Sequence, residues 1–556
     1  MRARPGQPTG ARDGRTAPET RRHARQPRPL SAPADNRAIA AEILSALHGA
    51  GVRTICICPG GRNAPLVEAL DAAREAFDVV SFFEERSAAF FALGRIRRDN
   101  APAAVMTTSG TAAAELLPAM LEARHAGLPL VAVTADRPRA LRGTGAPQTI
   151  DQIPLFAAAQ APVIDIDSPG QIETLPPLDG PVHLNACFDE PLLDGESAKI
   201  FTGHPSAPLQ PVPWMDEAEA RDICADFFDA VRNPLVLVSS LRPPEAHALA
   251  PWLASLSCPL YLEAVSQLRT HRTLQEFSLH SGERILRTPE CRAACDGVVR
   301  IGGIPTPRFW RELDGDSRPL LQISQLPFPG LARQSRVVPL RHFAAIAGAF
   351  APSGGRNETL FQRDREIAIR LEELLAREPR SETALVRALS QGLAENARIL
   401  LGNSLPVREW DLAAVRTPDA RYCFANRGVN GIDGLVSTGI GLAGAGRPAA
   451  AVLGDLSALY DLAGLWAARA PAAADITIAV INNGGGMIFD RMFKNPSFLN
   501  AHEIKLRGWA EMFGWHYGRM HDPHDAMPPG VPRLVEVVPD AHATKRFSDA
   551  YADLWK

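Results

Sequence analysis

Short apolar runs alternate with amphipathic stretches along most of the chain from Asn36 onward. Runs such as "TICICPGG", "AAVMTTSGT" and "PLVAVTADRP" have the length of buried strands, whereas "AIAAEILSALHGAGV" is amphipathic in the manner of a helix. Strands and helices that alternate repeatedly are typical of a parallel sheet covered by helices on both faces. The pattern therefore predicts an α/β fold made of doubly wound parallel sheets.

Two interruptions divide this pattern. Residues 201–216, "FTGHPSAPLQPVPWMD", have four prolines and little periodicity, and residues 351–358, "APSGGRNE", form a second polar break. The Arg-, Pro- and Gly-rich start of the chain has too few apolar side chains to fold alone. An organelle transit peptide is the alternative there, although Pro and Gly would interrupt its amphipathic helix. We predict a disordered tail over residues 1–33 and three α/β domains over residues 34–205, 206–355 and 356–556.

Composition and charge narrow the class of protein. With 556 residues, of which 46% are hydrophobic, the chain can form several cores. A net charge of -3 gives no overall attraction to nucleic acid, and no apolar run approaches the roughly 20 residues of a membrane span. The eight cysteines include no Cys-x-x-Cys pair and suit free thiols in a reducing compartment. We expect a cytoplasmic protein with neither a nucleic-acid partner nor a membrane span.

Two adjacent carboxylates, Glu84 and Glu85, lie among four phenylalanines in the segment "SFFEERSAAFF". A carboxylate in apolar surroundings is costly unless it is solvated, paired or used, and desolvation raises its pKa. The preceding strand-like run places both at a strand end, where ligands gather in open parallel sheets. The alternative is that they open a helix, whose N-terminus favours acidic side chains.

The most informative stretch is "GDLSALYDLAGLWAARAPAAADITIAVINNGGGMIF". Asp455 closes one strand-like run and Asn483 closes the next, with a single crossover between them. Because neighbouring parallel strands end at one edge, these two side chains can reach the same hard cation, such as Mg²⁺. The glycines at 484–486 let the backbone approach phosphate groups, and a helix opening near Leu456 adds N–H donors. Either dipeptide alone would suit an ordinary turn, but together they favour a metal and diphosphate site.

Gly-Asp followed by Asn-Asn at this separation resembles the signature of thiamine-diphosphate enzymes. The resemblance implies three α/β domains, of which the first binds the pyrimidine ring and the third binds the diphosphate. It also implies a glutamate at a strand end of the first domain that shares a proton with the aminopyrimidine ring. Glu85 is the candidate for that role.

Further segments resemble one family of these enzymes, the 2-succinyl-5-enolpyruvyl-6-hydroxy-3-cyclohexene-1-carboxylate (SEPHCHC) synthases of menaquinone biosynthesis. They are "CPGGRNAPL", "EERSAAFFALG", "TSGTAAAELLPAMLEA", "TADRPRALRGTGAPQTIDQ", "GNSLPVREWD" and "NRGVNGIDGLVSTGIGLA". The resemblance implies a transferase that decarboxylates 2-oxoglutarate and transfers the resulting unit to isochorismate. It implies thiamine diphosphate with Mg²⁺, or Mn²⁺ in its place, and a homodimer or homotetramer with active sites between subunits.

The roles of family residues carry over position by position. The implied catalytic residues are Glu85 and Ile432, the latter an apolar wedge under the cofactor, and the implied metal ligands are Asp455, Asn483 and the Gly485 carbonyl. Further implied cofactor contacts are Gly454, Leu456 and Ser457. The implied substrate-binding set is Arg62, Arg137, Gln148, Asn403, Ser404, Arg408 and, by a weaker match, Arg308. Arginine suits these substrates, because each has two carboxylates that a guanidinium binds bidentately.

The chain departs from the family pattern near the expected substrate cleft, at Gly61, Asn63, Pro147 and Gly484. One alternative is another thiamine-diphosphate enzyme, such as a 2-oxoacid decarboxylase or an acetolactate-type synthase, whose monocarboxylic substrates would not need the arginine set. The other is a catalytically silent cofactor-binding protein on the same fold. Retention of Glu85 together with Asp455 and Asn483 argues against a silent protein.

Overall fold

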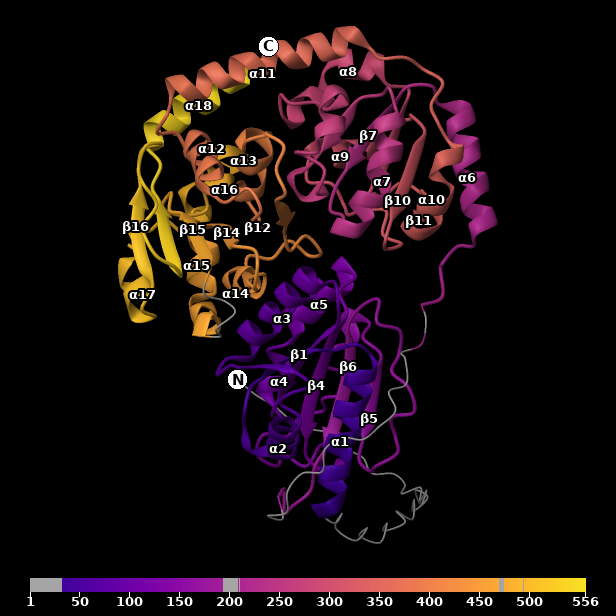
Figure 1. Cartoon of the computed structure of the whole chain (residues 1–556), viewed down its shortest axis with the longest axis vertical. Coiled ribbons are helices and arrows are strands. Elements are labelled where there is room, and N and C mark those ends of the chain that lie inside the picture. The colour runs from indigo at the N-terminus through magenta and orange to yellow at the C-terminus, as the bar shows by residue number, and fades with distance from the viewer. Residues whose placement is uncertain (1–32, 194–208, 210, 470–474, 494) are drawn as a thin grey trace, which may run out of the picture.

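The computed structural model describes residues 33–193, 209, 211–469, 475–493 and 495–556. Three parallel sheets follow one another along the chain, each covered by helices (Figure 1), which confirms the predicted fold class. The domain boundaries stay predictions, since the one near residue 205 and the expected tail up to residue 32 lie outside the described residues. None of the helices in the described ranges is long and apolar enough to cross a membrane.

The first domain has a six-stranded parallel sheet in the order β2-β1-β3-β4-β6-β5. Its strands are β1 (Thr54–Ile57), β2 (Asp78–Ser81), β3 (Ala103–Thr107), β4 (Leu130–Asp136), β5 (Val163–Ile166) and β6 (Val182–Cys187). Its helices are α1 (Pro33–Gly49), α2 (Ala64–Ala72), α3 (Glu85–Asp99), α4 (Thr111–Ala114) and α5 (Leu117–Ala126). The central strands β3, β4 and β6 are buried along their whole length, because helices cover both faces.

The middle domain has a five-stranded parallel sheet in the order β11-β10-β9-β7-β8. Its strands are β7 (Pro234–Val238), β8 (Leu260–Leu262), β9 (Gly297–Ile301), β10 (Leu320–Ser324) and β11 (Val337–Pro339). Its helices are α6 (Glu217–Ala230), α7 (Pro243–Ser255), α8 (Pro289–Ala294), α9 (Arg308–Glu312) and α10 (Leu340–Ile346). The long helix α11 (Glu358–Arg377) leads from this domain to the third along the top of Figure 1.

The third domain has a six-stranded parallel sheet in the order β13-β12-β14-β15-β17-β16. Its strands are β12 (Arg398–Leu401), β13 (Tyr422–Phe424), β14 (Ala449–Gly454), β15 (Ile476–Ile481), β16 (His516–Met520) and β17 (Arg533–Val537). Its helices are α12 (Glu382–Gly392), α13 (Leu405–Ala413), α14 (Leu435–Gly441), α15 (Asp455–Tyr460), α16 (Met487–Phe493), α17 (Arg507–Met512) and α18 (Ala541–Asp553). The strand order repeats that of the first sheet. In both sheets the second strand lies on one side of the first strand, and the chain then continues on the other side of it. Ligands bind at the carboxyl ends of strands at such a switch point.

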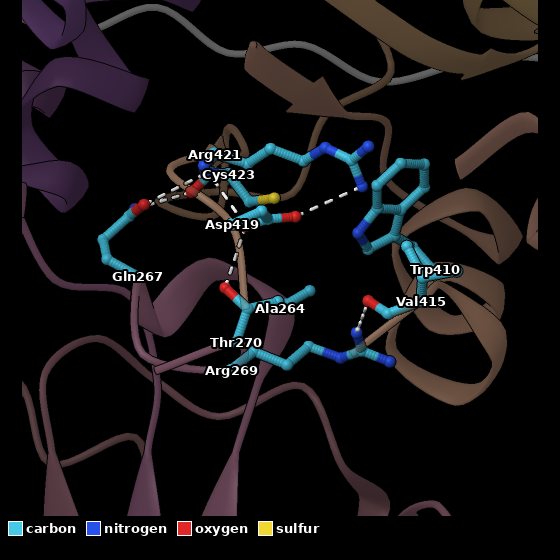
Figure 2. A pocket seen from close by; sticks show the side chains of 9 residues that line it. All are labelled: Ala264, Gln267, Arg269, Thr270, Trp410, Val415, Asp419, Arg421 and Cys423. Carbon is cyan, nitrogen blue, oxygen red and sulfur yellow. Dashed lines mark hydrogen bonds and ion pairs between the residues drawn. The ribbon is translucent and has the colours of Figure 1, made fainter. Parts of the chain in front are cut away.

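Backbone-directed hydrogen bonds join the middle and third domains around a small hollow (Figure 2). Gln267 donates to the Cys423 carbonyl at 2.6 Å and accepts from the Cys423 N–H at 3.0 Å, while Arg269 donates to the Val415 carbonyl at 3.0 Å. The hollow, of about 20 Å³, has room for about one water molecule. The hollow therefore lies within a contact between two domains and is too small for an organic ligand.

The first and third domains pack through α3 and α14, where glycines let the two helices approach closely. A Cβ atom on Gly94 would lie 2.2 Å from the Thr438 carbonyl oxygen and 2.7 Å from the Gly441 Cα atom. A Cβ atom on Gly441 would lie 2.3 Å from the Phe91 carbonyl oxygen. Side chains of both domains form one continuous apolar core across this contact. The relative position of the two domains therefore depends on these glycines.

Gly94→Ala should destabilise this contact, because the added methyl group meets backbone atoms that can move only if the helices separate. We expect the free energy of unfolding to fall by about 1–3 kcal/mol, the usual cost of overpacking a core. Urea denaturation measures the change. Gly348→Ala is the control, because a Cβ atom there meets nothing within 4 Å. Equal losses of stability in the two variants would contradict the close-packing argument.

Candidate functional site

The third sheet brings the Gly-Asp and Asn-Asn segments to one edge. Strands β14 and β15 pair in parallel with Gly454 opposite Ile481, so Asp455 and Asn483 follow at neighbouring strand ends. One carboxylate oxygen of Asp455, Oδ2, accepts hydrogen bonds from the backbone N–H groups of Gly484 and Gly485, each at 2.9 Å. The two segments predicted to meet are therefore in direct contact.

The side-chain amide of Asn483 presents a buried oxygen that the protein leaves unused. Its Nδ2 donates to Glu382 Oε2 at 2.9 Å, whereas its Oδ1 is buried and has no hydrogen-bond partner. A buried polar atom in this state costs about 1–3 kcal/mol. A hard cation would remove that cost, since Mg²⁺ takes carboxylate and neutral oxygens as ligands. The residues at this edge therefore fit a metal site.

The loop after Asn483 has a backbone conformation that favours glycine. Gly484 and Gly485 have φ angles of 84° and 137°. A Cβ atom on Gly485 would also lie 2.4 Å from the Leu499 carbonyl oxygen. The loop therefore keeps bare backbone beside Asp455, which lets a diphosphate group approach closely.

The Asp455 carboxyl is 2% exposed, and this burial raises its pKa. The N–H groups of Leu456, Gly484 and Gly485 oppose the rise by donating to the carboxylate, and a bound cation would act in the same direction. His502 also approaches, with its Nε2 3.4 Å from Asp455 Oδ2. Sequence reasoning missed His502, because it lies in a loop outside the motif.

Asn403 supports the segment that carries Ile432. It follows β12, and its Nδ2 donates to the carbonyls of Asn426 and Gly431 at 2.8 and 2.6 Å. Arg427 donates to Asn403 Oδ1 at 3.0 Å. Ile432, the next residue after Gly431, is half-buried. Asn403 thus fixes the loop before the expected wedge, and its contact with substrate stays a prediction.

Arg408 faces a cavity of about 300 Å³ between the middle and third domains. It lies on α13, just after Ser404, and its Nη1 donates to the Ser404 carbonyl at 2.6 Å. Thr306 and Pro307 also line the cavity. The side chain of the next residue, Arg308, is 74% exposed. The structure therefore gives Arg408 a half-buried position on the cavity wall and Arg308 a solvent-facing one.

Arg427 is a further cationic group on this side of the third domain. Burial lowers the pKa of Arg427, and the nearby charge of Arg408 lowers it further, whereas Glu263 opposes the change. Glu263 lines the cavity, and burial raises its pKa to about 7. Sequence reasoning missed Arg427, although it follows Asn426 after a strand, as the predicted arginines follow small or polar residues after theirs.

The two adjacent glutamates of the first domain have different surroundings. Glu84 is the cap of α3, since its carboxylate accepts from the N–H groups of Arg86 and Ser87 at 3.1 and 2.9 Å. Glu85 begins the helix and is half-buried. Burial raises the pKa of Glu85, and the charges of Glu84 and Glu115 raise it further. The helix-opening role therefore belongs to Glu84, and Glu85 has the environment of a proton-holding acid.

Arg62, Arg137 and Gln148 meet at the carboxyl edge of the first sheet. Arg137 donates to Ser109 Oγ at 2.6 Å and to the Gln148 carbonyl at 2.8 Å. Burial lowers the pKa of Arg137, and the nearby charge of Arg62 lowers it further. Arg62 pairs with Glu190 at 3.0 Å. The carboxylates of Asp136 and Glu190 offset part of the repulsion between the two guanidinium groups, and a carboxylate ligand would offset more of it.

A buried network that sequence reasoning missed supports this edge. Gln152 accepts from the Gly110 N–H at 2.9 Å and donates to Asn185 Oδ1 at 2.8 Å. Asn185 in turn donates to Asp136 Oδ2 at 3.1 Å. Asp136 immediately precedes Arg137, so the network fixes the backbone from which that arginine extends.

Within one chain, Glu85 and Asp455 belong to separate groups of residues. The carboxylates that act on Glu85 are Glu84 and Glu115 of the first domain. The groups that act on Asp455 all belong to the third domain. Across the described residues, no hydrogen bond or ion pair joins Glu85 to Asp455 or Asn483. The chain therefore presents two half-sites, one at the edge of each six-stranded sheet.

These half-sites define a thiamine-diphosphate-dependent enzyme, and the family model of the thiamine pyrophosphate enzyme N-terminal TPP binding domain matches residues 37–155. The chain is 38% identical to the 2-succinyl-5-enolpyruvyl-6-hydroxy-3-cyclohexene-1-carboxylate synthase of Bdellovibrio bacteriovorus, over 94% of this chain and 99% of the relative. It is 35% identical to the synthases of the same name from Akkermansia muciniphila and Chloroflexus aurantiacus, over 89% of this chain and 95% and 92% of those relatives. The chain belongs to the SEPHCHC synthase family.

Asp455→Ala should abolish the magnesium-dependent binding of thiamine diphosphate, because it removes the only ionised side chain of the candidate ligand set. Calorimetric titration with and without Mg²⁺ measures this loss. Asp549→Ala is the control, since Asp549 is a 66% exposed partner of Lys545 and its loss should leave binding unchanged. Unaltered affinity and magnesium dependence in Asp455→Ala would exclude this metal site.

Glu85→Gln should keep cofactor binding but lower turnover by about a hundredfold or more, because a neutral amide cannot relay a ring proton. Glu84→Gln is the matched control. Its single amide oxygen can still accept from one of the two N–H groups, and the variant keeps Glu85, so turnover should fall far less than in Glu85→Gln. Steady-state rates decide, and near-normal turnover by Glu85→Gln would remove Glu85 from the mechanism.

Proposed function

We propose that this enzyme decarboxylates 2-oxoglutarate and transfers the resulting succinyl-semialdehyde unit to isochorismate, giving SEPHCHC and carbon dioxide in menaquinone biosynthesis. The observation that carries the proposal is a pair of neighbouring guanidinium groups in each of the two domains, Arg62 with Arg137 in the first and Arg408 with Arg427 in the third. Both substrates are dicarboxylates, which arginine recognises bidentately. Relatives that match nearly the whole chain bear the name of the synthase that makes this product, which supports the same reaction.

In this proposal the third domain holds the diphosphate end of the cofactor. Asp455, Asn483 and the Gly485 carbonyl bind Mg²⁺, or Mn²⁺ in its place, and the backbone from Gly454 to Ser457 lies beside the phosphates. Ile432 would give the bound cofactor an apolar contact. Glu85 faces the aminopyrimidine ring, where its raised pKa lets the carboxyl keep or share a proton. When bound, thiamine diphosphate supplies the electron sink for the loss of carbon dioxide.

We further propose a homodimer or homotetramer in which the first domain of one subunit completes the third-domain half-site of another. Two features support this arrangement besides the separation of Glu85 from Asp455. Phe83, next to the glutamates, is 60% exposed. Phe489 and Phe493, just after the glycine loop, are 37% and 49% exposed. A partner subunit would cover these apolar side chains.

A cytoplasmic location suits the eight cysteines, all of them free thiols.

The proposal is tested by incubating the purified full-length protein with Mg²⁺, thiamine diphosphate, 2-oxoglutarate and isochorismate and identifying the product by mass. We expect SEPHCHC only when both substrates are present. Carbon dioxide without a ligated product would favour a simple 2-oxoacid decarboxylase, and turnover of pyruvate alone would favour an acetolactate-type synthase. Cofactor binding without any turnover would favour a catalytically silent protein.

Variants of the two guanidinium pairs should slow different steps of the reaction. We propose that Arg408 holds the distal carboxylate of 2-oxoglutarate, and that Arg62 holds a carboxylate of isochorismate. Arg408→Ala should then slow carbon dioxide release even without acceptor, whereas Arg62→Ala should spare that step and slow ligation. Loss of one charge-assisted contact should slow the affected step about tenfold to a hundredfold.

Single-turnover measurements of decarboxylation and ligation check this division of roles. Arg74→Ala is the control for the loss of an arginine, because the Arg74 side chain is 72% exposed and pairs with the nearby Asp71. It should leave both steps unchanged. Equal effects of Arg408→Ala and Arg62→Ala on both steps would refute the division.

A further inference from the structure

We propose that Glu382 is a positioning residue of the metal site, which holds the Asn483 amide so that its oxygen faces the cation. This inference rests on the proposed role of Asp455 and Asn483 as metal ligands. Glu382 Oε2 accepts the hydrogen bond from Asn483 Nδ2 at 2.9 Å, and Asn483 Oδ1 is left buried without a partner. The contact joins the start of α12 to the loop after β15.

The hydrogen bond to Glu382 decides which way the amide points. A carboxylate can only accept hydrogen bonds, whereas an amide has a donor end and an acceptor end. Beside Glu382, Asn483 must therefore turn its Nδ2 group toward the carboxylate and its oxygen away. A neutral glutamine at position 382 could either accept or donate, and it would stabilise both orientations of the amide.

Glu382 is itself held in place, as a positioning residue must be. It is 2% exposed, and its backbone N–H donates to Thr544 Oγ1 on α18 at 3.0 Å. The preceding residue, Ser381, caps the helix by accepting from the Ala384 N–H at 3.3 Å. Partners of this kind typically change metal affinity about tenfold to a hundredfold when they are removed.

The neighbouring amide provides an internal comparison. Asn482 also donates to a buried carboxylate, Glu536 Oε1, at 2.7 Å, and to the Ile504 carbonyl at 2.8 Å. Glu536 is 1% exposed and also accepts from the Tyr517 hydroxyl, so the two pairs share the amide–carboxylate contact and its burial. Only the pair formed by Asn483 leaves its amide oxygen buried without a partner. Glu536→Gln is therefore a matched control for Glu382→Gln.

The experiment measures the Mg²⁺ concentration that gives half-maximal binding of thiamine diphosphate, by calorimetry and by quenching of tryptophan fluorescence. Glu382→Leu should raise this concentration about tenfold to a hundredfold. Glu382→Gln should raise it less, because one orientation of the glutamine still accepts from Asn483. Glu536→Gln should leave it unchanged. The melting temperature of each metal-free variant shows whether it folds. If Glu382→Leu does not fold, Glu382→Gln still tests the inference.

An unchanged magnesium requirement in both Glu382 variants, or an equal rise in Glu536→Gln, would overturn the inference. Asp455→Ala separates this failure from failure of the metal site itself. If Asp455→Ala loses magnesium-dependent binding while the Glu382 variants do not, the ligand assignment stands and only the positioning role falls. If Asp455→Ala also binds normally, the metal site proposed under the function is wrong.

Discussion

The parallel pairing of β14 with β15 is the constraint on which the candidate site depends. Main-chain hydrogen bonds place Gly454 opposite Ile481, so the residues that follow both strands emerge side by side. Asp455 then fixes the glycine loop through Oδ2 and holds the Leu456 N–H through Oδ1, at 2.7 Å. The positions of the candidate metal ligands thus follow from sheet geometry, and side-chain contacts only refine them.

A buried carboxyl group connects α3, which begins at Glu85, with α14, which follows the loop of Ile432. Asp461 accepts from the Ser437 N–H at 2.7 Å, from Ser437 Oγ at 3.0 Å and from Ser87 Oγ at 3.1 Å. Ser87 lies in the first turn of α3, which begins at Glu85, and Ser437 lies on α14, just after the Ile432 loop. Because a buried acceptor that loses its donors is costly, these helices cannot shift independently. The close glycine contact between α3 and α14 reinforces the same connection.

Adjacent residues of the same type have different roles in this protein. The Glu84 carboxylate accepts hydrogen bonds from N–H groups of its own helix, whereas Glu85 is the carboxyl whose pKa is raised by burial. Asn482 likewise uses its amide to hold Glu536, which leaves Asn483 as the amide with an open oxygen. In each pair one residue stabilises the local backbone or core, and the other is available for a ligand.

The sequence by itself determined the parallel α/β sheets and the meeting of Asp455 with Asn483, because periodicity and crossover length are local signals that sheet geometry converts directly into positions. It also placed Arg62, Arg137 and Arg408 at strand ends. Only the tertiary structure decided that Arg308 faces solvent, and that Glu382, which lies 101 residues before Asn483, orients its amide. These outcomes depend on which distant segments pack together and on which polar atoms that packing removes from water, and no local pattern of residues encodes either.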